Sequence, residues 1–588
     1  MERKNVVTLA LGAAVVVLLG AVAVLVLQPN PPPVNPPPVV GDEDYKWGFL
    51  TRGTAEIAQE FAQLGVPFVR TGTIELYMPF DELDAYYRAF EFEGIELAVT
   101  PQPNFKDSTE KIIGGIRPFV QRYDGDADYD NDGKADGEKM PFVKYWQLGT
   151  EVDASATGIE KATPQRYAEV LKEFYIMVKE ESPRAKVVGP SVIGHMNFPN
   201  DQGRDSKDYI KQVIDAGGLA YTDMIDFHYY YWWDALNYDD IKYSVDFLRA
   251  NAKGKEIMLG ETGAPSGTVE YEFDGTITKR FYSEESQAAY LAKIFPYSFA
   301  LGIDKVVWAY GMVESKWGTE TAGGVLMQGL GGQKSAQQSV LSDFKLDLDL
   351  GSATLTWQNP EEEDISGVMM RYSTSAYPQT VKDGTLLAEV AVQPGEVSAY
   401  VFNGAKSAVK YYYSLFPKYA DGSYGAPSEN FGRYVDHYFA HTGLIYNGYG
   451  SDDKGAGVKK RSYYAYKLMS EKLGQCKLGT AKIVQTGVPN TIVVSIGKKN
   501  GKMLYVAWSD TAPASNGGGS VPPVVAEGSM PPIVAQNPSV EIFVGAGNAK
   551  VTNSVPDSAG NVSSETVPAR NGTLKIELGN SPVYIEPI

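Results

Sequence analysis

The sequence predicts an α/β protein built on a (β/α)8 (TIM) barrel, with an inserted β-sandwich, a C-terminal β-sandwich and an N-terminal transmembrane helix. Three observations predict this architecture. Eight short apolar runs alternate with amphipathic stretches of helical period over about 270 residues from residue 45. The alternation then gives way to short strand-like runs, and the chain opens with one long apolar segment.

The apolar segment at the start, Val6 to Leu27, is long enough to cross a membrane. About 22 residues in a helix extend about 33 Å, and the hydrocarbon core of a bilayer is about 30 Å thick. Arg3 and Lys4 precede it, which keeps this end cytoplasmic and exports the rest. A cleaved signal peptide is the alternative, but its apolar core is usually shorter. We therefore expect residues 1–28 to be a single-pass anchor in the cell membrane, with an extracellular globular body.

A proline-rich linker, residues 29–44, follows the apolar segment. Runs of proline favour the extended polyproline II conformation, which makes a stiff spacer. The same composition is found in ligands of proline-binding domains, which is the competing interpretation. We expect the linker to hold the globular body away from the membrane.

The first part of the barrel is expected at residues 45–335. Helical stretches between its apolar runs include Thr163–Glu181, which opens with a capping threonine and then proline, and Ser283–Ala300. A doubly wound open sheet is the alternative, but no glycine-rich phosphate loop follows the first run. The eight expected strands are Trp47–Leu50, Val66–Val69, Glu96–Val99, Val143–Leu148, Lys186–Gly189, Met224–Phe227, Glu256–Leu259 and Lys305–Trp308.

The remaining three segments are assigned from changes in period. Residues 336–430 show short alternating strands and predict an inserted β-sandwich. Residues 431–475 return to a helical period at Ser462–Leu473, so we expect them to complete the barrel with its last helix. Residues 476–588 are strand-like again and predict the C-terminal sandwich. Strands expected in the insertion are Ala353–Gln358, Val368–Ser373 and Lys410–Phe416.

Composition limits the possible partners. The net charge of −19 repels nucleic acid, so no nucleic-acid partner is expected. A single cysteine, Cys476, excludes an intramolecular disulfide and a thiolate metal cluster. Four histidines are few for a multi-histidine metal centre. No cofactor is expected for catalysis.

Two glutamates stand where barrel strands should end. Glu151 follows the fourth expected strand and Glu261 follows the seventh. Catalytic groups of TIM-barrel enzymes gather at this C-terminal face. Retaining glycosidases need two carboxyl groups about 5–5.5 Å apart, one as acid/base and one as nucleophile. The alternative is a pair of carboxylates at the rim that arginines neutralise.

Other polar and aromatic residues follow the strands at the same face. Arg70 ends the second strand and could lower the pKa of a nucleophile. His228 and Tyr230 end the sixth strand, and Trp308 ends the eighth, where its ring could form an apolar floor for a sugar. Each residue alone is more often structural, but together with the two glutamates they favour a sugar-cleaving site.

This set of residues resembles the clan-A retaining glycoside hydrolases, and within them the family 39-like enzymes. The resemblance covers about residues 45–315 and 437–475, and the insertion resembles a fibronectin type III module. It implies Glu151 as acid/base and Glu261 as nucleophile, with Arg70, His228, Tyr230 and Trp308 in support. The clan usually carries asparagine immediately before the acid/base, where it binds the sugar 2-hydroxyl. Thr150 occupies that position here, so either the substrate differs at that hydroxyl or catalysis is reduced or lost.

An acidic loop precedes the fourth strand. Asp128, Asp130, Asp132 and Asp136 follow the D-x-D-x-D-G spacing of calcium loops, whose hard oxygen ligands suit Ca²⁺. Lys139 stands where an EF-hand has its final glutamate, so a true EF-hand is not expected. The alternative is a solvated acidic loop. We expect a structural calcium ion on the N-terminal side of the barrel.

The sequence therefore favours an extracellular, membrane-anchored glycoside hydrolase that cleaves oligo- or polysaccharides by a retaining double displacement. A catalytically impaired glycan-binding or adhesive surface protein is the main alternative, supported by Thr150 and the added sandwich. A metal-dependent hydrolase is the third, but no histidine pair has ligand spacing near the expected mouth. The expected partners are a carbohydrate substrate and the membrane, which the N-terminal helix contacts.

Overall fold

The structure is a computed structural model of the 588-residue chain. It describes residues 45–588, apart from 52–54, 56, 73–78, 154–161, 195, 197–205, 231–237, 274–275, 315–318, 322–340, 350–351, 361–364, 404–409, 435–437, 449–451, 511–536 and 546. The expected anchor, 1–28, and the expected linker, 29–44, lie outside the described residues. In the part of the chain that is described, every helix is too short or too polar to cross a bilayer.

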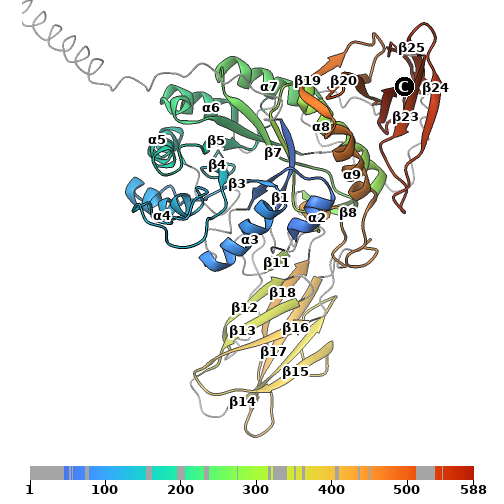
Figure 1. The fold of residues 1–588 in the computed structure, drawn as a ribbon. Helices are drawn as coiled ribbons and strands as arrows, with labels where there is room; N and C mark the ends of the chain where they lie inside the picture. The colour runs from blue at the N-terminus through green and yellow to red at the C-terminus, as the bar shows by residue number, and fades with distance from the viewer. Residues whose placement is uncertain are drawn as a thin grey trace, which may run out of the picture.

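The eight expected strands form a closed barrel of parallel strands, which confirms the predicted barrel (Figure 1). Each strand pairs with the next along the chain, and the eighth pairs with the first, which closes the sheet. The strands are β1 (Lys46–Thr51), β2 (Phe68–Thr71), β3 (Glu96–Val99), β4 (Val143–Gln147), β5 (Lys186–Val192), β6 (Met224–Tyr230), β7 (Glu256–Gly263) and β10 (Lys305–Trp308).

Among the described residues, a helix follows every barrel strand. The side chain of Thr163 caps α5 and that of Ser283 caps α8, as the sequence signals indicate. The helix after β10 is α9, which comes only after the inserted sandwich and packs beside α8. The helices are α2 (Ile57–Gln63), α3 (Phe80–Phe92), α4 (Thr109–Arg122), α5 (Pro164–Glu181), α6 (Ser206–Asp215), α7 (Tyr238–Asn251), α8 (Glu284–Ala300) and α9 (Arg461–Leu473), with the 3-10 helices η2 (Gly218–Tyr221) and η3 (Tyr438–His441).

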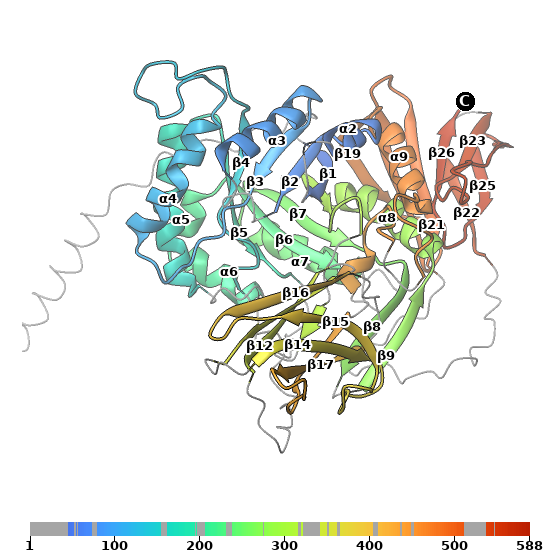
Figure 2. The same cartoon turned by 90° about the horizontal axis from the view of Figure 1, so that it is seen from below.

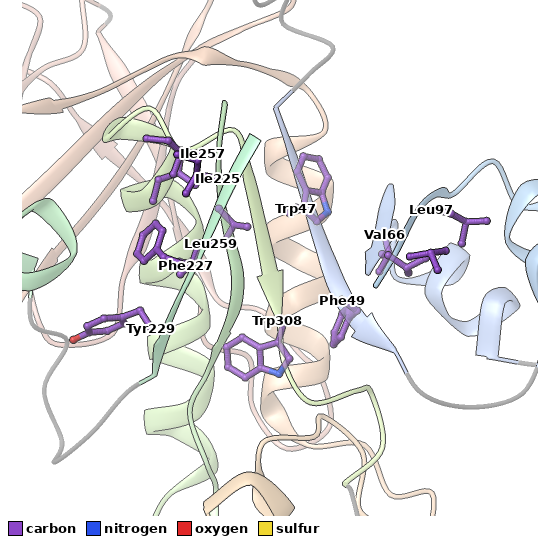
Figure 3. Packing of buried hydrophobic residues seen from close by; sticks show 14 of the residues in the cluster. Trp47, Phe49, Val66, Leu97, Ile225, Phe227, Tyr229, Ile257, Leu259 and Trp308 are labelled. Carbon is purple, nitrogen blue, oxygen red and sulfur yellow. The ribbon is translucent and has the colours of Figure 1, made fainter. Parts of the chain in front are cut away.

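Side chains of the barrel strands alternate between two cores, because successive residues of a strand point to opposite faces. On β6, Ile225, Phe227 and Tyr229 join the core shared with the helices, while Met224 and Tyr230 belong to the core inside the barrel. Figure 3 shows the three outward residues along one side of their strand, near Ile257 and Leu259 of β7. This alternation decides which residues at the strand ends can reach the mouth of the barrel.

The insertion after β10 is a two-sheet sandwich around its own apolar core. Figures 1 and 2 show it as a separate body beside the barrel. The three expected strands correspond to β13, β14 and β17. One sheet contains β12 (Ser342–Asp349), β13 (Ser352–Gln358) and β16 (Val397–Asn403), and the other contains β11 (Thr319–Thr321), β18 (Ser428–Tyr434), β17 (Lys410–Tyr419), β14 (Ile365–Ser373) and β15 (Thr385–Ala391).

The C-terminal strands form a second pair of sheets around a further apolar core. The other face of the larger sheet contributes Val494, Leu504 and Trp508 to the core shared with the barrel helices, so this sandwich is docked on α8 and α9. The larger sheet contains β19 (Cys476–Val484), β20 (Thr491–Lys498), β21 (Met503–Ser509), β26 (Val583–Pro587), β23 (Asn548–Asn553) and β24 (Ser564–Pro568), and the smaller contains β22 (Ser539–Phe543) and β25 (Thr573–Glu577).

One element was not expected from the sequence. A hairpin of β8 (Gly267–Phe273) and β9 (Thr276–Tyr282) extends between β7 and α8, at the C-terminal face of the barrel. Its first strand lies against η3, which follows the inserted sandwich. The mouth of the barrel is therefore bordered by segments that are distant in sequence.

Candidate active site

Glu261 is turned into the barrel mouth by an irregularity in β7. Met258 points into the barrel and Leu259 points out, so strict alternation would direct Glu261 outward. The pairing of β7 shifts by one residue against both neighbouring strands at this point, and Glu261 becomes the partner of His228 on β6. Bulges of this kind redirect side chains next to active sites. The shift therefore places a carboxylate in the mouth instead of the helix layer.

Gly260 makes this arrangement possible because it leaves space for a buried carboxylate. A Cβ atom at this position would lie 2.1 Å from Asp226 Oδ1, far inside van der Waals contact. Asp226 is fully buried on the inward side of β6, two residues before His228. A residue larger than glycine at position 260 would therefore clash with Asp226.

Glu151 lies beyond the end of β4, where the backbone is unusual. Its φ angle is 46°, in the left-handed region that residues other than glycine rarely adopt. Gly149, two residues earlier, also has a positive φ of 70°. Conformations of this kind cost free energy and cluster at functional sites. The turn brings the partly exposed side chain of Glu151 over the mouth, toward β6 and β7.

Glu261 is held by two strong donors. Arg70 Nη1 donates to Glu261 Oε1 at 2.8 Å, and the hydroxyl of Tyr230 donates to Oε2 at 2.6 Å. Burial by itself would raise the pKa of Glu261, but the charges of His228 and Arg70 lower it to about 2. Burial and the neighbouring carboxylate raise the pKa of Tyr230 well above its ordinary value, so its hydroxyl keeps its proton. Glu261 is therefore ionised and fixed in one orientation.

His228 lies between three carboxylates. Its Nδ1 is 2.9 Å from Glu151 Oε1 and 3.5 Å from Glu261 Oε2. Its Nε2 is 3.3 Å from Asp226 Oδ2, which also accepts a hydrogen bond of 2.6 Å from the hydroxyl of Ser191. Burial would lower the pKa of His228, but the charges of Glu261 and Asp226 raise it to about 10. The ring is therefore an imidazolium that donates from both nitrogens.

Arg70 connects the two sides of the mouth. Its side chain is buried, with Nε donating to Gln147 Oε1 at 3.1 Å and Nη2 donating to Thr150 Oγ1 at 2.8 Å. The backbone N–H of Thr150 donates to Gln102 Oε1 at 2.7 Å. The polar groups of Thr150 are thus engaged within the protein, and the same guanidinium that pairs with Glu261 also fixes the residue before Glu151.

The two glutamates approach each other closely. One carboxyl oxygen of Glu151, one of Glu261 and a ring nitrogen of His228 all lie within 4.8 Å of one another. Three such atoms could in principle bind a metal ion. The set suits one poorly, because Arg70 and Tyr230 already donate to the two carboxyl oxygens of Glu261. The close approach instead suits chemistry in which two carboxyl groups act on the two atoms of one bond.

The expected role of Trp308 as an apolar floor is wrong. Its side chain is fully buried in the core shared with the helices, packs against Tyr290 of α8, and donates from Nε1 to Thr442 O at 2.9 Å. Figure 3 shows it near Phe49. Alternation along β10 explains the error, since Val307 and Ala309 face inward and Trp308 faces outward. The aromatic residue packed on the inner core is Tyr310, whose ring stacks on Tyr230 with 6.2 Å between centroids.

In the acidic loop, three of the four expected ligands come together. Carboxylate oxygens of Asp128, Asp130 and Asp136 lie within 4.8 Å of one another, and these side chains are partly or fully exposed. Asp132 is not in this group, and its carboxylate pairs with Lys134 Nζ at 2.7 Å. Three carboxylates offer the hard oxygen ligands that Ca²⁺ takes. The loop lies between α4 and β4, at the end of the barrel away from the two glutamates.

Several residues of the site were missed by sequence reasoning. Asp226 could have been found, because it lies two residues before His228 and so shares its face of β6. Tyr310 has the outward parity of Trp308 and packs on the inner core only because it lies beyond the end of β10, so counting along the strand would not find it. Gln147 and Ser191 carry no local signal, because their roles depend on contacts with Arg70 and Asp226, which lie on other strands. Two expected residues, Arg70 and Tyr230, both reach Glu261.

Comparison with known proteins gives only distant similarity. No protein-family model matches the chain, and no curated protein sequence matches it. Solved structures similar to it include a glucosidase from Croceicoccus marinus, with 14% identity, a TM-score of 0.43 and coverage of 93% of this chain and 96% of that one. Others are β-glucuronidase 2 from Bacteroides uniformis (9%, TM-score 0.33, 93% and 66%) and an endo-1,4-β-xylanase from Caldicellulosiruptor owensensis (16%, TM-score 0.33, 46% and 87%). These neighbours are glycoside hydrolases. The fold class of this chain rests on its own closed barrel.

Proposed function

We propose that this chain is a retaining glycoside hydrolase acting on oligo- or polysaccharides, with Glu261 as nucleophile and Glu151 as acid/base. The observation that carries the proposal is the approach of the two carboxyl groups to within 4.8 Å at the barrel mouth. Retaining enzymes hold their carboxyl groups about 5–5.5 Å apart, whereas inverting enzymes leave about 6.5–9.5 Å for a water molecule. A separation of no more than 4.8 Å between one oxygen of each carboxyl group favours the retaining arrangement.

The surroundings of each carboxyl group suit its proposed step. In the first step, protonated Glu151 donates to the leaving oxygen while Glu261 attacks the anomeric carbon and forms a glycosyl ester. Arg70 and Tyr230 orient Glu261 for the attack. In the second step, Glu151 removes a proton from water, which attacks the same carbon and releases the sugar. The imidazolium of His228 spans both carboxylates and balances their charge.

A panel of activated 2-deoxy-2-fluoroglycosides tests this proposal. These reagents form the glycosyl ester quickly and lose it slowly, so mass spectrometry of peptides locates the nucleophile. We expect one sugar of the panel to label Glu261 and to inactivate hydrolysis of the matching aryl glycoside. Labelling at another residue, or inversion at the anomeric carbon in product analysis by NMR, would contradict the assignment.

A glycan-binding surface protein without turnover is the second candidate. Thr150 favours it, because it stands where the clan usually has the asparagine that binds the sugar 2-hydroxyl, and its hydroxyl oxygen and backbone N–H already contact Arg70 and Gln102. Such a protein would bind oligosaccharides, measured by calorimetric titration, but would neither release product nor become labelled. The fluoroglycoside panel therefore separates the two candidates.

We also propose that the acidic loop binds a structural calcium ion through Asp128, Asp130 and Asp136. Asp132 takes part only if its pair with Lys134 opens. Calcium titration should raise the thermal midpoint of unfolding, and the double variant D130N/D136N should abolish that rise. D107N, at an exposed aspartate paired with Lys111 in another loop, is the matched control and should keep the rise. An equal calcium response in both variants would exclude the site.

The location and the finer family assignment remain proposals from the sequence. We propose that residues 1–28 anchor the protein in the cell membrane and that the barrel lies outside the cell. Protease protection of intact cells, with an epitope at the C-terminus, tests the orientation. The family 39-like assignment and the fibronectin type III-like assignment of the insertion are proposed in the same way. The three-stranded and five-stranded sheets of the insertion support the latter.

A further inference from the structure

The chain that returns from the inserted sandwich is tied to the ends of two barrel strands. We call residues Tyr438–Thr442 the return segment. The hydroxyl of Tyr438 donates to Gly263 O, at the end of β7, at 2.8 Å. Thr442 Oγ1 accepts the backbone N–H of Tyr310, just after β10, at 2.9 Å. The return segment is therefore fixed to the same strand ends that carry the proposed site.

A buried ion pair reinforces this attachment. Lys460 Nζ donates to Glu314 Oε1 at 2.5 Å and to His441 O at 3.3 Å, and both side chains of the pair are almost fully buried. Glu314 precedes the insertion and Lys460 follows it, and the backbone N–H of Glu314 donates to Ile445 O at 2.9 Å. The two ends of the insertion are thus held side by side at the barrel mouth.

The attachment places Phe439 against the aromatic residues beside Glu261. Its ring meets that of Tyr230 at 4.8 Å and 73°, and that of Tyr310 at 5.2 Å and 82°. The rings of Tyr230 and Tyr310 are nearly parallel, 10° apart. Edge-to-face contacts of this kind are the favoured geometry of aromatic pairs. Phe439 therefore packs on both tyrosines at once and restricts the rotation of their rings.

We propose that Phe439 is a positioning residue that acts through Tyr230 to hold the hydroxyl on Glu261. The hydrogen of a tyrosine hydroxyl prefers the plane of the ring, so the orientation of the ring decides in which direction the hydroxyl donates. Tyr230 donates to Glu261 Oε2 at 2.6 Å, and a proposed nucleophile must be held within a fraction of an ångström for attack. The insertion thus supplies part of the support of the nucleophile. This inference rests on the proposed glycosidase function.

A double-mutant cycle on the full chain tests the inference, with F439L, Y230F and Y230F/F439L. F439L should lower kcat about tenfold with little change in KM, since it removes two aromatic contacts. The double variant should be no slower than Y230F, because Phe439 acts only through the hydroxyl that Y230F lacks. F439Y keeps a ring and should restore most of kcat. F402L, at a half-buried phenylalanine packed on Tyr372 and Tyr411 in the sandwich, is the matched control and should leave kcat unchanged.

Two results would overturn the inference: a loss in the double variant equal to the product of the single losses, or an effect of F439L on KM alone. The second would make Phe439 a wall of the sugar site instead. A measurement without turnover covers the case in which no sugar is hydrolysed. Carbon-13 NMR of glutamate side chains, with E261Q to assign the signal, should show a higher pKa for Glu261 in F439L than in wild type. An unchanged pKa in folded F439L would refute the role, whereas a wild type without activity refutes only the proposed function.

Discussion

The two glutamates at the barrel mouth follow the ends of facing strands, but the protein holds them in opposite ways. Glu261 lies within β7, its side chain is only 5% exposed, and it accepts hydrogen bonds from Arg70 and Tyr230. Glu151 lies beyond the end of β4, its side chain is 20% exposed, and its Oε1 lies 2.9 Å from Nδ1 of His228. The carboxylate of Glu261 is therefore held in one orientation by its hydrogen bonds, whereas that of Glu151 is held by fewer contacts among the described residues.

This difference matches what the two proposed roles require. A nucleophile must be ionised and correctly aimed at all times, and the donors around Glu261 provide both conditions. An acid/base must gain and lose a proton in each cycle and must contact the leaving group and then water. A carboxyl group that is partly exposed to solvent can do so. The asymmetry therefore distinguishes the two glutamates without reference to their strands.

Replacing Glu261 should give the largest effect. E261Q removes the nucleophile and leaves the buried Arg70 without its carboxylate, so kcat should fall by about 10⁴-fold or more. The matched control is E256Q, at the other end of β7, where a buried glutamate pairs with Lys186 at 2.5 Å. E256Q should cost comparable stability in urea unfolding but leave kcat near the wild-type value. Similar losses of kcat in both variants would mean that activity follows the stability of β7 and not a nucleophile.

Replacing Glu151 should give a smaller loss that depends on the substrate. E151A removes the proton donor, and general acid catalysis is worth about 10²–10⁴-fold for a poor leaving group. An activated aryl glycoside needs no proton in its first step, so its glycosyl ester should still form. Steady-state and burst kinetics with two leaving groups of different pKa measure this contrast. Equal losses with both leaving groups would contradict the acid role of Glu151.

Because of His228, the free energy of unfolding should decrease as the pH becomes alkaline. Its pKa is about 10 in the folded protein, above its ordinary value of 6.5. The folded state therefore binds the proton more tightly, and the resulting stability is fully present below pH 6.5. It is lost as the pH rises through 10, and it amounts to a few kcal/mol, on the order of the shift. Glu261 behaves oppositely, since its lowered pKa gives stability above pH 4.5 that is lost as the pH falls through 2.

Urea unfolding between pH 6 and pH 10 measures this dependence. Wild type should lose stability across that range, and H228N should show a much flatter profile. H228N will be less stable at every pH, because it leaves buried carboxylates unpaired, so only the slope is diagnostic. Equal slopes would mean that His228 is neutral in the folded protein and that the imidazolium does not span the two glutamates.

The sequence was sufficient for the barrel because its strands are short apolar runs whose order along the chain is also their order in space. It was sufficient for Arg70, Glu151, His228, Tyr230 and Glu261 because each stands at a strand end, and in a parallel barrel all such ends meet at one face. The ends of strands can be recognised from the sequence alone. The structure confirms the closed parallel barrel, and it brings these five residues together.

The sequence could not predict which side of its strand a side chain occupies in every case, nor which distant segments come into contact. Trp308 stands at a strand end, but its parity on β10 turns it toward the helices. Glu261 has the outward parity too, and only the bulge in β7 returns it to the mouth. Parity can be counted from neighbouring residues, whereas a bulge is decided by pairing with two other strands. Phe439 reaches the site only after the chain has passed through the inserted sandwich.

Replacing Gly260 tests the bulge in β7. Of the four replacements, it should have the smallest effect. In G260A, the new methyl group would meet Asp226 Oδ1 at 2.1 Å, so either the aspartate or the bulge must shift. Such overpacking typically costs about 1–3 kcal/mol of unfolding free energy. G114A is the matched control, because a Cβ at Gly114 of α4 meets nothing within 4 Å, and it should be neutral or slightly stabilising. If the bulge aims Glu261, G260A should also slow fluoroglycoside labelling beyond any loss of folded protein. Normal labelling in a destabilised G260A would show that Asp226, and not the bulge, gives way.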